Sequence, residues 1–544
     1  MTFTPRGVDS SVVEIELTSF VEHLPERGFV EIVAEVRNRT NKEASWEFQF
    51  KAYEGYRRDG QLLRHSRNVT VGPAAVRRFR FRVPVYPTLQ SSYSQQPRMS
   101  VRIMGPGTFT SDEYFFGNVR KNTGDLHRYV LVTDEALRTP DGSSLPLSEI
   151  NKVCRDKNIP VHLQNFDADL FPDSEIALLG FDLLLMHESE WASFGRGREV
   201  LEAWIAQGGD VLLINEANKE PIATGLGAVH TDPPFGSAKD LADTLSSFTN
   251  LSMRVLERGR FYENNWDLRE TVPDIKKPIG VLMILVIAVA GILGPLNLGI
   301  AFRRRKSLQV LWTTPLLSIG ISVLVGALIL FRDGFGGDGV RMQWVLLLPK
   351  QQLEVSWQEQ VSRTGVLPSS RFQLDESWWL RPVATHKRDL RSPYSYGLQP
   401  GGFYEGDWFG NRRVQAQVAQ RVQSSRAQVR VRWENQTPLL LSTVETPFSR
   451  ILYRDSRGKV WKGEQITPGK TTPLVSVPSS EAKTMIGEMN PHKESLFPEK
   501  GMLNQKGWFY AEGLNAERMV DTLTSISWED HAVWFLGPVV GETL

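Results

Sequence analysis

Two apolar stretches in the middle of the chain decide the expected fold: residues 278–302, PIGVLMILVIAVAGILGPLNLGIAF, and residues 307–331, SLQVLWTTPLLSIGISVLVGALILF. Neither stretch contains a charged residue, and each has 25 residues. A helix of that length reaches roughly 37 Å, which exceeds the hydrocarbon core of a bilayer at about 30 Å. The sequence therefore predicts an integral membrane protein, with a two-helix transmembrane hairpin at 275–332.

Four consecutive cations separate the two stretches: Arg303, Arg304, Arg305 and Lys306. Short loops rich in Lys and Arg stay in the cytoplasm, so these residues are the expected topology determinants. We expect localisation in the cytoplasmic (inner) membrane with two transmembrane helices and with the soluble domains outside, in the periplasm or extracellular space. One alternative stays open, because residues 1–5 begin no signal peptide. Either a signal precedes them, or both soluble parts face the cytosol.

Four residues within the hairpin are predicted to shape its helices: Gly294, Pro295, Asn297 and Pro315. Proline removes a backbone donor and kinks a helix, and an amide side chain can hydrogen-bond to a partner helix. Because neither helix carries an internal charge, the sequence favours an anchor over a channel or transporter.

Residues 1–120 are expected to form an immunoglobulin-like β sandwich. Apolar residues of 79–85 alternate with Arg78, Arg80 and Arg82, which is the period of a strand with one solvated face. A solvated outer face is the favoured interpretation of these arginines, and binding of an anion or a partner is the alternative.

Residues 126–260 are expected to form an α/β domain with a parallel sheet, of flavodoxin-like or amidotransferase-like type. Apolar runs at 129–133, 161–163, 178–186 and 210–214 alternate with helical patterns at 147–157 and 196–207. Strands that are apolar on both faces and alternate with helices are typical of a parallel sheet covered by helices.

Polar residues follow the strands of this predicted sheet: Asp134, His187, Glu188 and Glu216. Ligands of such sheets bind beyond the carboxyl ends of the strands, so these residues form the candidate ligand crevice. Polar strand ends are also common without any function. Metal-ligand spacing, a phosphate loop and a dinucleotide fingerprint are all absent from the sequence, so we expect no metal, no cofactor and no catalytic residue.

The segment from Phe181 to Asn215, with Trp204-Ile205-Ala206-Gln207-Gly208-Gly209 inside it, resembles the class I glutamine amidotransferase-like fold. Gly294-Pro295-Leu296-Asn297 followed by the basic loop also resembles the hairpin of exported bacterial two-helix membrane proteins of poorly defined function. The amidotransferase nucleophile is a Cys on a sharp turn, whereas the turn here is His187-Glu188-Ser189 and Cys154 falls in a predicted helix. The resemblance therefore implies a pseudoenzyme module. A Ser189–His187 pair is a conceivable substitute, although we expect poor mutual geometry.

Residues 340–544 are expected to form a mainly-β, sandwich-like domain, entered through a flexible linker at 334–339. Its aromatic segments lie at 378–379 and 403–409. Core packing is the favoured interpretation of these aromatic residues. An interfacial belt against a membrane and a docking surface are the alternatives.

The charge balance of 63 basic and 62 acidic residues gives no argument for nucleic acid as a partner. We therefore expect a non-enzymatic, membrane-anchored scaffold or assembly protein of a bacterial envelope system, with the lipid bilayer and other envelope proteins as partners. The resemblance implies that these partners belong to AAA+ ATPase, von Willebrand A-type or ABC-exporter systems. A membrane-bound hydrolase and a ligand sensor, both using the strand-end crevice, are the alternatives.

Overall fold

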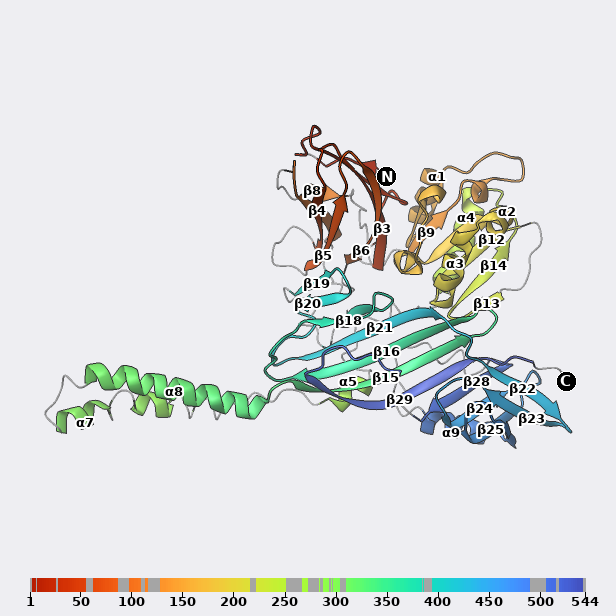
Figure 1. Cartoon of the computed structure of the whole chain (residues 1–544). Helices are drawn as coiled ribbons and strands as arrows, with labels where there is room; N and C mark the ends of the chain where they lie inside the picture. The colour runs from red at the N-terminus through yellow and green to blue at the C-terminus, as the bar shows by residue number, and fades with distance from the viewer. Residues whose placement is uncertain are drawn as a thin grey trace.

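A computed structural model gives the fold (Figure 1). It describes residues 2–5, 7–25, 28–54, 62–86, 97–108, 113–115, 128–215, 222–250, 267–272, 283, 287–292, 295, 297–303, 310–383, 385, 394–489, 505–514 and 518–541.

The N-terminal unit packs two sheets face to face. One has the order β1-β2-β3-β6, and β4, β5, β7 and β8 belong to the other. Their strands are β1 (Thr2–Phe3), β2 (Val13–Ser19), β3 (Gly28–Asn38), β4 (Ala44–Glu54), β5 (Leu62–Val71), β6 (Val76–Tyr86), β7 (Pro97–Met104) and β8 (Glu113–Phe115). The alternation read from the sequence is present, since Val13, Ile15 and Leu17 are buried and Glu14 and Glu16 are exposed. The apolar faces of both sheets meet in one core around Trp46 and Phe48.

Strands from residues 372–406 extend the second of these sheets, whose order is β17-β20-β19-β5-β4-β7-β8. The added strands are β17 (Phe372–Gln373), β19 (Ser395–Gln399) and β20 (Phe403–Gly406). Strand β19 runs parallel to β5, with Ser395 opposite Leu62 and Leu398 opposite His65. One continuous sheet therefore joins the N-terminal sandwich to the C-terminal part.

The α/β unit has a six-stranded sheet of order β10-β9-β11-β12-β14-β13, in which β13 alone is antiparallel to its neighbour. Its strands are β9 (Arg128–Val132), β10 (Val161–Asn165), β11 (Leu183–His187), β12 (Asp210–Ile214), β13 (Ile222–Thr224) and β14 (Gly227–Asp232). Its helices are η1 (Glu135–Leu137), α1 (Leu147–Asp156), η2 (Ala168–Leu170), η3 (Glu175–Leu178), α2 (Glu188–Ser193), α3 (Arg196–Ala206) and α4 (Ala238–Asn250).

A nine-stranded sheet of order β18-β21-β16-β15-β29-β28-β24-β25-β27 dominates the C-terminal part, and β22, β23 and β26 form a small sheet beside it. The elements are β15 (Gly337–Leu348), β16 (Leu353–Thr364), β18 (Trp379–Val383), β21 (Val414–Ser424), β22 (Val429–Glu434), β23 (Thr437–Ser442), β24 (Phe448–Arg454), β25 (Val460–Ile466), β26 (Thr471–Pro473), β27 (Val475–Val477), β28 (Trp508–Gly513), β29 (Ile526–Pro538), α5 (Asp267–Thr271) and α9 (Ser479–Met489). The expected linker at 334–339 is shorter than predicted, because β15 already begins at Gly337.

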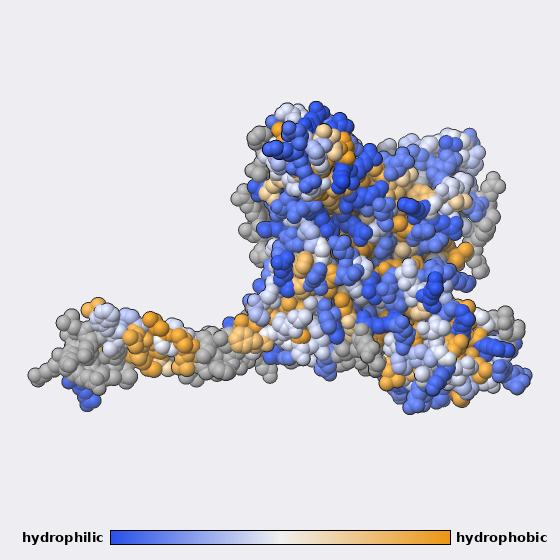
Figure 2. Space-filling model, viewed as in Figure 1, coloured by the Kyte–Doolittle hydropathy of each residue, from blue (hydrophilic) through white to orange (hydrophobic). Residues whose placement is uncertain are grey.

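Helices α7 (Asn297–Arg303) and α8 (Val310–Asp333) form an arm that projects from the β body (Figure 1). Its surface carries exposed apolar side chains, including Leu311, Trp312 and Leu316 (Figure 2). Among the described residues, however, none of the helices combines the length and the apolar composition that crossing a bilayer requires. The predicted transmembrane hairpin is therefore wrong.

This correction rests on the helices that the structure describes in the two apolar stretches. In the first stretch these are residues 287–291 and the 7-residue α7, and 278–282, 284–286, 293–294 and 296 lie outside the described residues. Helix α8 has 24 residues, but Pro315 lies inside it and its last turn includes Arg332 and Asp333. The membrane-protein fold class, the membrane keywords and the inner-membrane localisation are corrected together, because all three rested on the hairpin.

The predicted topology and packing residues are placed only in part. Arg303 ends α7, Asn297 begins it, and Pro295 lies two residues earlier. Gly294 and the remaining basic-loop residues, 304–306, lie outside the described residues.

The sandwich and the α/β unit are joined by direct hydrogen bonds and by a shared core. The buried side chain of Gln164 accepts from the His23 backbone N–H at 2.9 Å and donates to the His23 carbonyl at 2.9 Å. The Asp167 backbone N–H donates to the Phe20 carbonyl at 2.8 Å. One apolar cluster runs from Phe48 of the sandwich to Trp204 of α3. The two units therefore share one packed interior.

Candidate functional site

The carboxyl ends of β9, β11 and β12 meet at one edge of the α/β sheet, as the crevice hypothesis requires. Asp134 follows β9, and its carboxylate accepts a hydrogen bond from the Asn165 amide at 2.6 Å. His187 ends β11 and caps helix α2. Glu188 begins that helix, and Glu216 lies outside the described residues. The structure therefore brings Asp134, His187 and Glu188 to one edge without testing the fourth member.

The polar groups at this edge are engaged in local structure. His187 Nδ1 lies 2.7 Å from Ser189 Oγ, so the expectation of poor geometry for this pair is wrong. The Glu190 carboxylate accepts from the His187 backbone N–H at 2.9 Å and from Thr133 Oγ1 at 2.6 Å. The side chains of His187 and Glu190 form a capping box that starts α2. Among the described residues, no group of His, Cys, Asp or Glu side chains could hold a metal ion.

Cys154 lies inside α1 and is fully buried, in agreement with its predicted helical position. Burial raises the pKa of its thiol to about 11, and the positive charge of Lys157 opposes this only weakly. The thiolate is the reactive form, so this cysteine is not an activated nucleophile at neutral pH.

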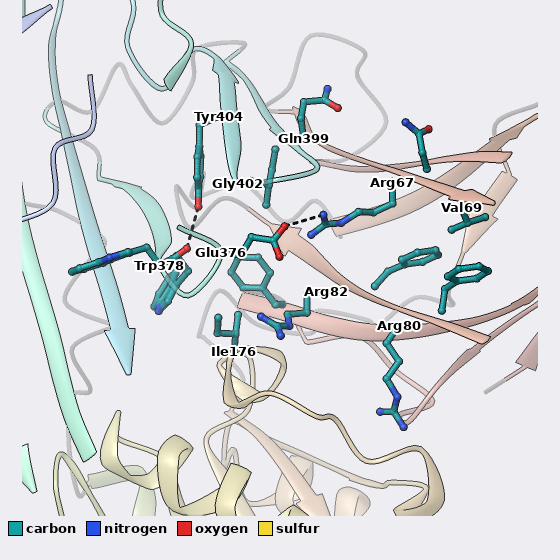
Figure 3. A pocket seen from close by; sticks show the side chains of 16 residues that line it. Arg67, Val69, Arg80, Arg82, Ile176, Glu376, Trp378, Gln399, Gly402 and Tyr404 are labelled. Atoms are coloured by element: carbon teal, nitrogen blue, oxygen red, sulfur yellow. Dashed lines mark hydrogen bonds and ion pairs between the residues drawn. The ribbon is translucent and has the colours of Figure 1, made fainter. Parts of the chain in front are cut away.

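A cavity of about 320 Å³ lies where the sandwich, the α/β unit and the C-terminal strands meet (Figure 3). Strands β5 and β6 supply one wall, the segment before β18 and the β19–β20 hairpin supply another, and Ile176 of η3 closes a third side. Its size falls in the range of small-molecule pockets. The lining residues are Phe29, Arg67, Asn68, Val69, Phe79, Arg80, Phe81, Arg82, Ile176, Glu376, Trp378, Trp379, Leu398, Gln399, Gly402 and Tyr404.

Aromatic rings make up much of the cavity wall. Trp378 and Trp379 are each 5% exposed and Tyr404 is 4% exposed, so they belong to the packed interior. Phe29 meets Trp379 edge to face, with ring centroids 6.2 Å apart. The favoured prediction of core packing for the aromatic segments is confirmed at these positions, and the same rings also face an open space.

Arg67 is held on the cavity wall by two groups of different kinds. Its Nε donates to His65 Nε2 at 3.2 Å, and its Nη1 lies 3.4 Å from the Glu376 carboxylate. Burial, followed by the positive charge of Arg67, lowers the pKa of His65 to about 3. His65 is therefore a neutral acceptor that orients the guanidinium. Glu376 also accepts the Gly401 backbone N–H at 3.2 Å, and its side chain is 58% exposed.

The two other cavity arginines differ in their pairing. Arg80 forms ion pairs with buried Glu31 and, at 3.2 Å, with Asp173 of the α/β unit. Burial raises the pKa of Glu31, and Arg80 opposes that shift. Figure 3 shows Arg80 pointing away from Glu376, whereas Arg82 lies beside Ile176. Among the described acidic side chains, none forms an ion pair with Arg82.

The β19–β20 turn sets the shape of the cavity floor. Gly402 has a φ of +72°, and a Cβ there would lie 1.9 Å from the Leu374 carbonyl oxygen, so only glycine fits. Tyr404 stacks on Phe372 with ring centroids 5.1 Å apart, and its hydroxyl donates to the Trp378 carbonyl at 3.4 Å. Burial raises the pKa of the Tyr404 phenol far above its ordinary value, so the hydroxyl stays a neutral donor.

The sequence points to parts of this site but not to their meeting in one cavity. It offers binding of an anion or a partner as an alternative for Arg80 and Arg82, and a docking surface as an alternative for the aromatic segments. Their meeting depends on the parallel pairing of β19 with β5, which no local pattern signals. Glu376 and Arg67 had no such signal, since each is a single charged residue in an ordinary polar context.

Comparisons with known proteins give no family. No family model matches the chain, and no curated protein sequence matches it. A predicted β-galactosidase of Bacteroides fragilis is 10% identical with a TM-score of 0.22, over 40% of this chain and 41% of that one. A Bacteroides uniformis β-glucuronidase is 16% identical with a TM-score of 0.19, over 38% and 28%.

A third similarity is to the yeast δ-COP μ-homology domain in complex with a Dsl1 peptide, at 8% identity and a TM-score of 0.19, over 37% of this chain and 96% of that domain. The chain thus spans less than half the length of the two glycosidases. TM-scores of this size carry no argument about fold or activity.

The comparisons also leave the amidotransferase-like classification unsupported, because no family model matches the chain. The resemblance to exported bacterial proteins is not tested by these comparisons and stays a prediction.

Proposed function

We propose that this protein is a non-enzymatic scaffold that binds other molecules through the cavity at the junction of its three parts. The observation that carries the proposal is the composition of that cavity. Its walls come from β5 and β6, from η3 and from the β19–β20 hairpin, so a ligand there contacts all three parts at once. Pockets where separate units meet are a common place for binding.

The fixed arrangement of the parts supports a binding role. Strand β19 continues the sheet at β5, and Gln164 connects the α/β unit to the sandwich through two hydrogen bonds. A wall whose side chains are held before the ligand arrives loses little conformational entropy on binding.

The chemistry of the cavity also supports binding rather than catalysis. Its polar residues are arginines, one carboxylate, two amides and a phenol that burial keeps neutral. Among the described cavity residues, none is a serine, cysteine or lysine beside a general base, which is the arrangement that covalent catalysis needs. AAA+ ATPase, von Willebrand A-type and ABC-exporter systems stay predictions for the partner, since they rest on the sequence resemblance alone.

Site-directed photo-cross-linking tests this proposal. A photoreactive residue replaces Asn68, which is exposed and lines the cavity, or Ser189, which is exposed at the strand edge. We expect a cross-linked species in native cells from position 68 that disappears in an Arg82→Gln background and persists in an Arg78→Gln background. A species captured only from position 189, or one that is indifferent to Arg82, would contradict the proposal.

A second candidate function, a hydrolase at the strand edge, is favoured by one observation. His187 Nδ1 lies 2.7 Å from Ser189 Oγ, which is the contact between a base and a nucleophile. The same atoms cap α2, because the Ser189 backbone N–H also donates to Nδ1 at 3.3 Å. The capping role explains the contact without catalysis, so the scaffold is the better-supported function.

Turnover of chromogenic esters and amides by the purified full chain separates the two candidates. The scaffold proposal predicts no turnover that changes in Ser189→Ala or His187→Ala. Turnover that both variants abolish, with circular dichroism unchanged, would establish the hydrolase instead.

A further inference from the structure

We propose that the junction cavity binds a small monoanionic carboxylate that carries a flat aromatic body. This inference rests on the proposed function, because it names the ligand class of the same cavity. It follows from three properties of the described lining residues: the charge that lacks a partner, the rings of the wall and the available volume.

The charges favour a single negative charge. Arg80 is already paired with Glu31 and Asp173, and Arg67 is shared with Glu376. Arg82 is the lining cation without an acidic partner among the described residues. One carboxylate would give exposed Arg82 the acidic partner that it lacks among the described residues. A dianion would bring excess negative charge close to Glu376, which lines the same cavity (Figure 3).

The geometry of a carboxylate also suits the donors. A guanidinium presents a planar fork of N–H groups that matches the two oxygens of a carboxylate. Arg67 is oriented in advance by neutral His65, so a carboxylate on Arg82 can take a second, weaker contact from Arg67 while Glu376 keeps its bond from the Gly401 backbone.

The wall favours an aromatic body for the ligand. Six lining residues are aromatic, and a flat ring system packs against such walls edge to face or offset. A volume of about 320 Å³ admits a two-ring acid or the last side chain of a peptide.

Isothermal titration calorimetry on the full chain tests the inference with 2-naphthoate as the probe. The uncharged 2-naphthamide and the dianionic 2-naphthyl phosphate are the matched ligand controls. We expect naphthoate to bind at least tenfold more tightly than either control. Equal affinity for naphthoate and naphthamide, or no heat from naphthoate at millimolar concentration, would overturn the inference.

A pair of variants locates the bound carboxylate. Arg82→Gln removes the unpaired cation, and we expect at least tenfold weaker naphthoate binding. Arg78→Gln is the matched control, because Arg78 lies on the same strand and pairs with Glu35 outside the cavity. An equal effect of the two variants would overturn the assignment to the cavity.

Two peptide ligands distinguish a free acid from the carboxyl end of a chain. A hexapeptide that ends in phenylalanine is compared with its C-terminal amide. Tighter binding of the free acid peptide than of naphthoate identifies a chain end as the source of the carboxylate, and the reverse order identifies a free acid. If naphthoate fails while the cross-link from position 68 still depends on Arg82, the ligand class is wrong and the scaffold proposal stands.

Discussion

The carboxyl edge of the α/β sheet and the junction cavity both gather polar side chains, but they differ in how those side chains are satisfied. At the edge, Glu190 and His187 bond to each other's backbone and start a helix. In the cavity, Arg82 lacks an acidic partner among the described residues and faces open space. The difference teaches that polar residues in a favourable topological position are poor evidence of a site until their partners are counted.

The largest expected effect concerns His65, whose side chain accepts a hydrogen bond from Arg67 on the cavity wall. Its pKa is about 3 in the folded chain and about 6.5 in the unfolded chain. As the pH falls, the unfolded state is therefore protonated before the folded state. The stability from this group is complete above pH 6.5 and is lost as the pH falls from 6.5 toward 3. We expect a loss of about 1 kcal/mol per pH unit in that window, measured by urea unfolding.

Two variants isolate this contribution from that of the carboxylates. His65→Gln should flatten the pH dependence relative to the wild type across the same window. Arg67→Gln removes the nearby positive charge, so the pKa of His65 in the folded chain should rise. The pH range over which stability is lost should then become narrower at its acidic end. Identical slopes in the wild type and in His65→Gln would show that the imidazole is not buried in the neutral form.

A smaller effect is expected from the cavity floor. Gly402→Ala should destabilise the chain by about 1–3 kcal/mol more than Gly401→Ala, and it should weaken naphthoate binding. Both glycines have a positive φ, but an added Cβ lies 1.9 Å from a backbone oxygen at Gly402 and 3.5 Å from a ring carbon at Gly401. Thermal unfolding of the pair measures the difference, and equal costs would mean that the turn moves freely.

A substitution at the strand edge should lower the stability of the chain without changing its affinity for naphthoate. Glu190→Ala removes the acceptor of the His187 backbone bond of the capping box and of the Thr133 hydroxyl bond, and we expect a loss of about 0.5–2 kcal/mol. Naphthoate affinity should stay at the wild-type value, because Glu190 does not line the cavity. A loss of affinity in a folded Glu190→Ala protein would show that the two regions are coupled.

The smallest effect is expected from Arg78→Gln. The Arg78 side chain is 73% exposed and lies 2.8 Å from Glu35 across two strands. Exposed ion pairs contribute about 0–1 kcal/mol, so chemical denaturation should show a change within that range. A larger loss would disqualify this variant as the control for Arg82→Gln.

Local sequence patterns predicted the strands well and the assembly poorly. The alternation around Val13 and Ile15 and the apolar run ending at Ile214 both match observed strands, because burial on one or two faces leaves a direct periodic signal. The apolar stretches at 278–331 gave a wrong prediction, because hydropathy reports apolar content alone. Among the described helices, none combines the length and the apolar composition that crossing a bilayer requires.

The cavity could not be predicted because its residues meet through long-range pairing. Leu398 reaches the site only because β19 lies beside His65 of β5, and Ile176 reaches it only because η3 packs against the sandwich. The strand-end residues were easier to find, since consecutive parallel strands share an edge by topology. The sequence therefore predicts a site at the strand edge, whereas the contacts of the folded chain favour the junction cavity.

The most direct test of this account is the calorimetric affinity of the full chain for 2-naphthoate in Arg82→Gln and in His187→Ala. The account predicts at least tenfold weaker binding in Arg82→Gln and wild-type affinity in His187→Ala. Weaker binding in His187→Ala with no change in Arg82→Gln would place the ligand at the strand edge and contradict the central claim.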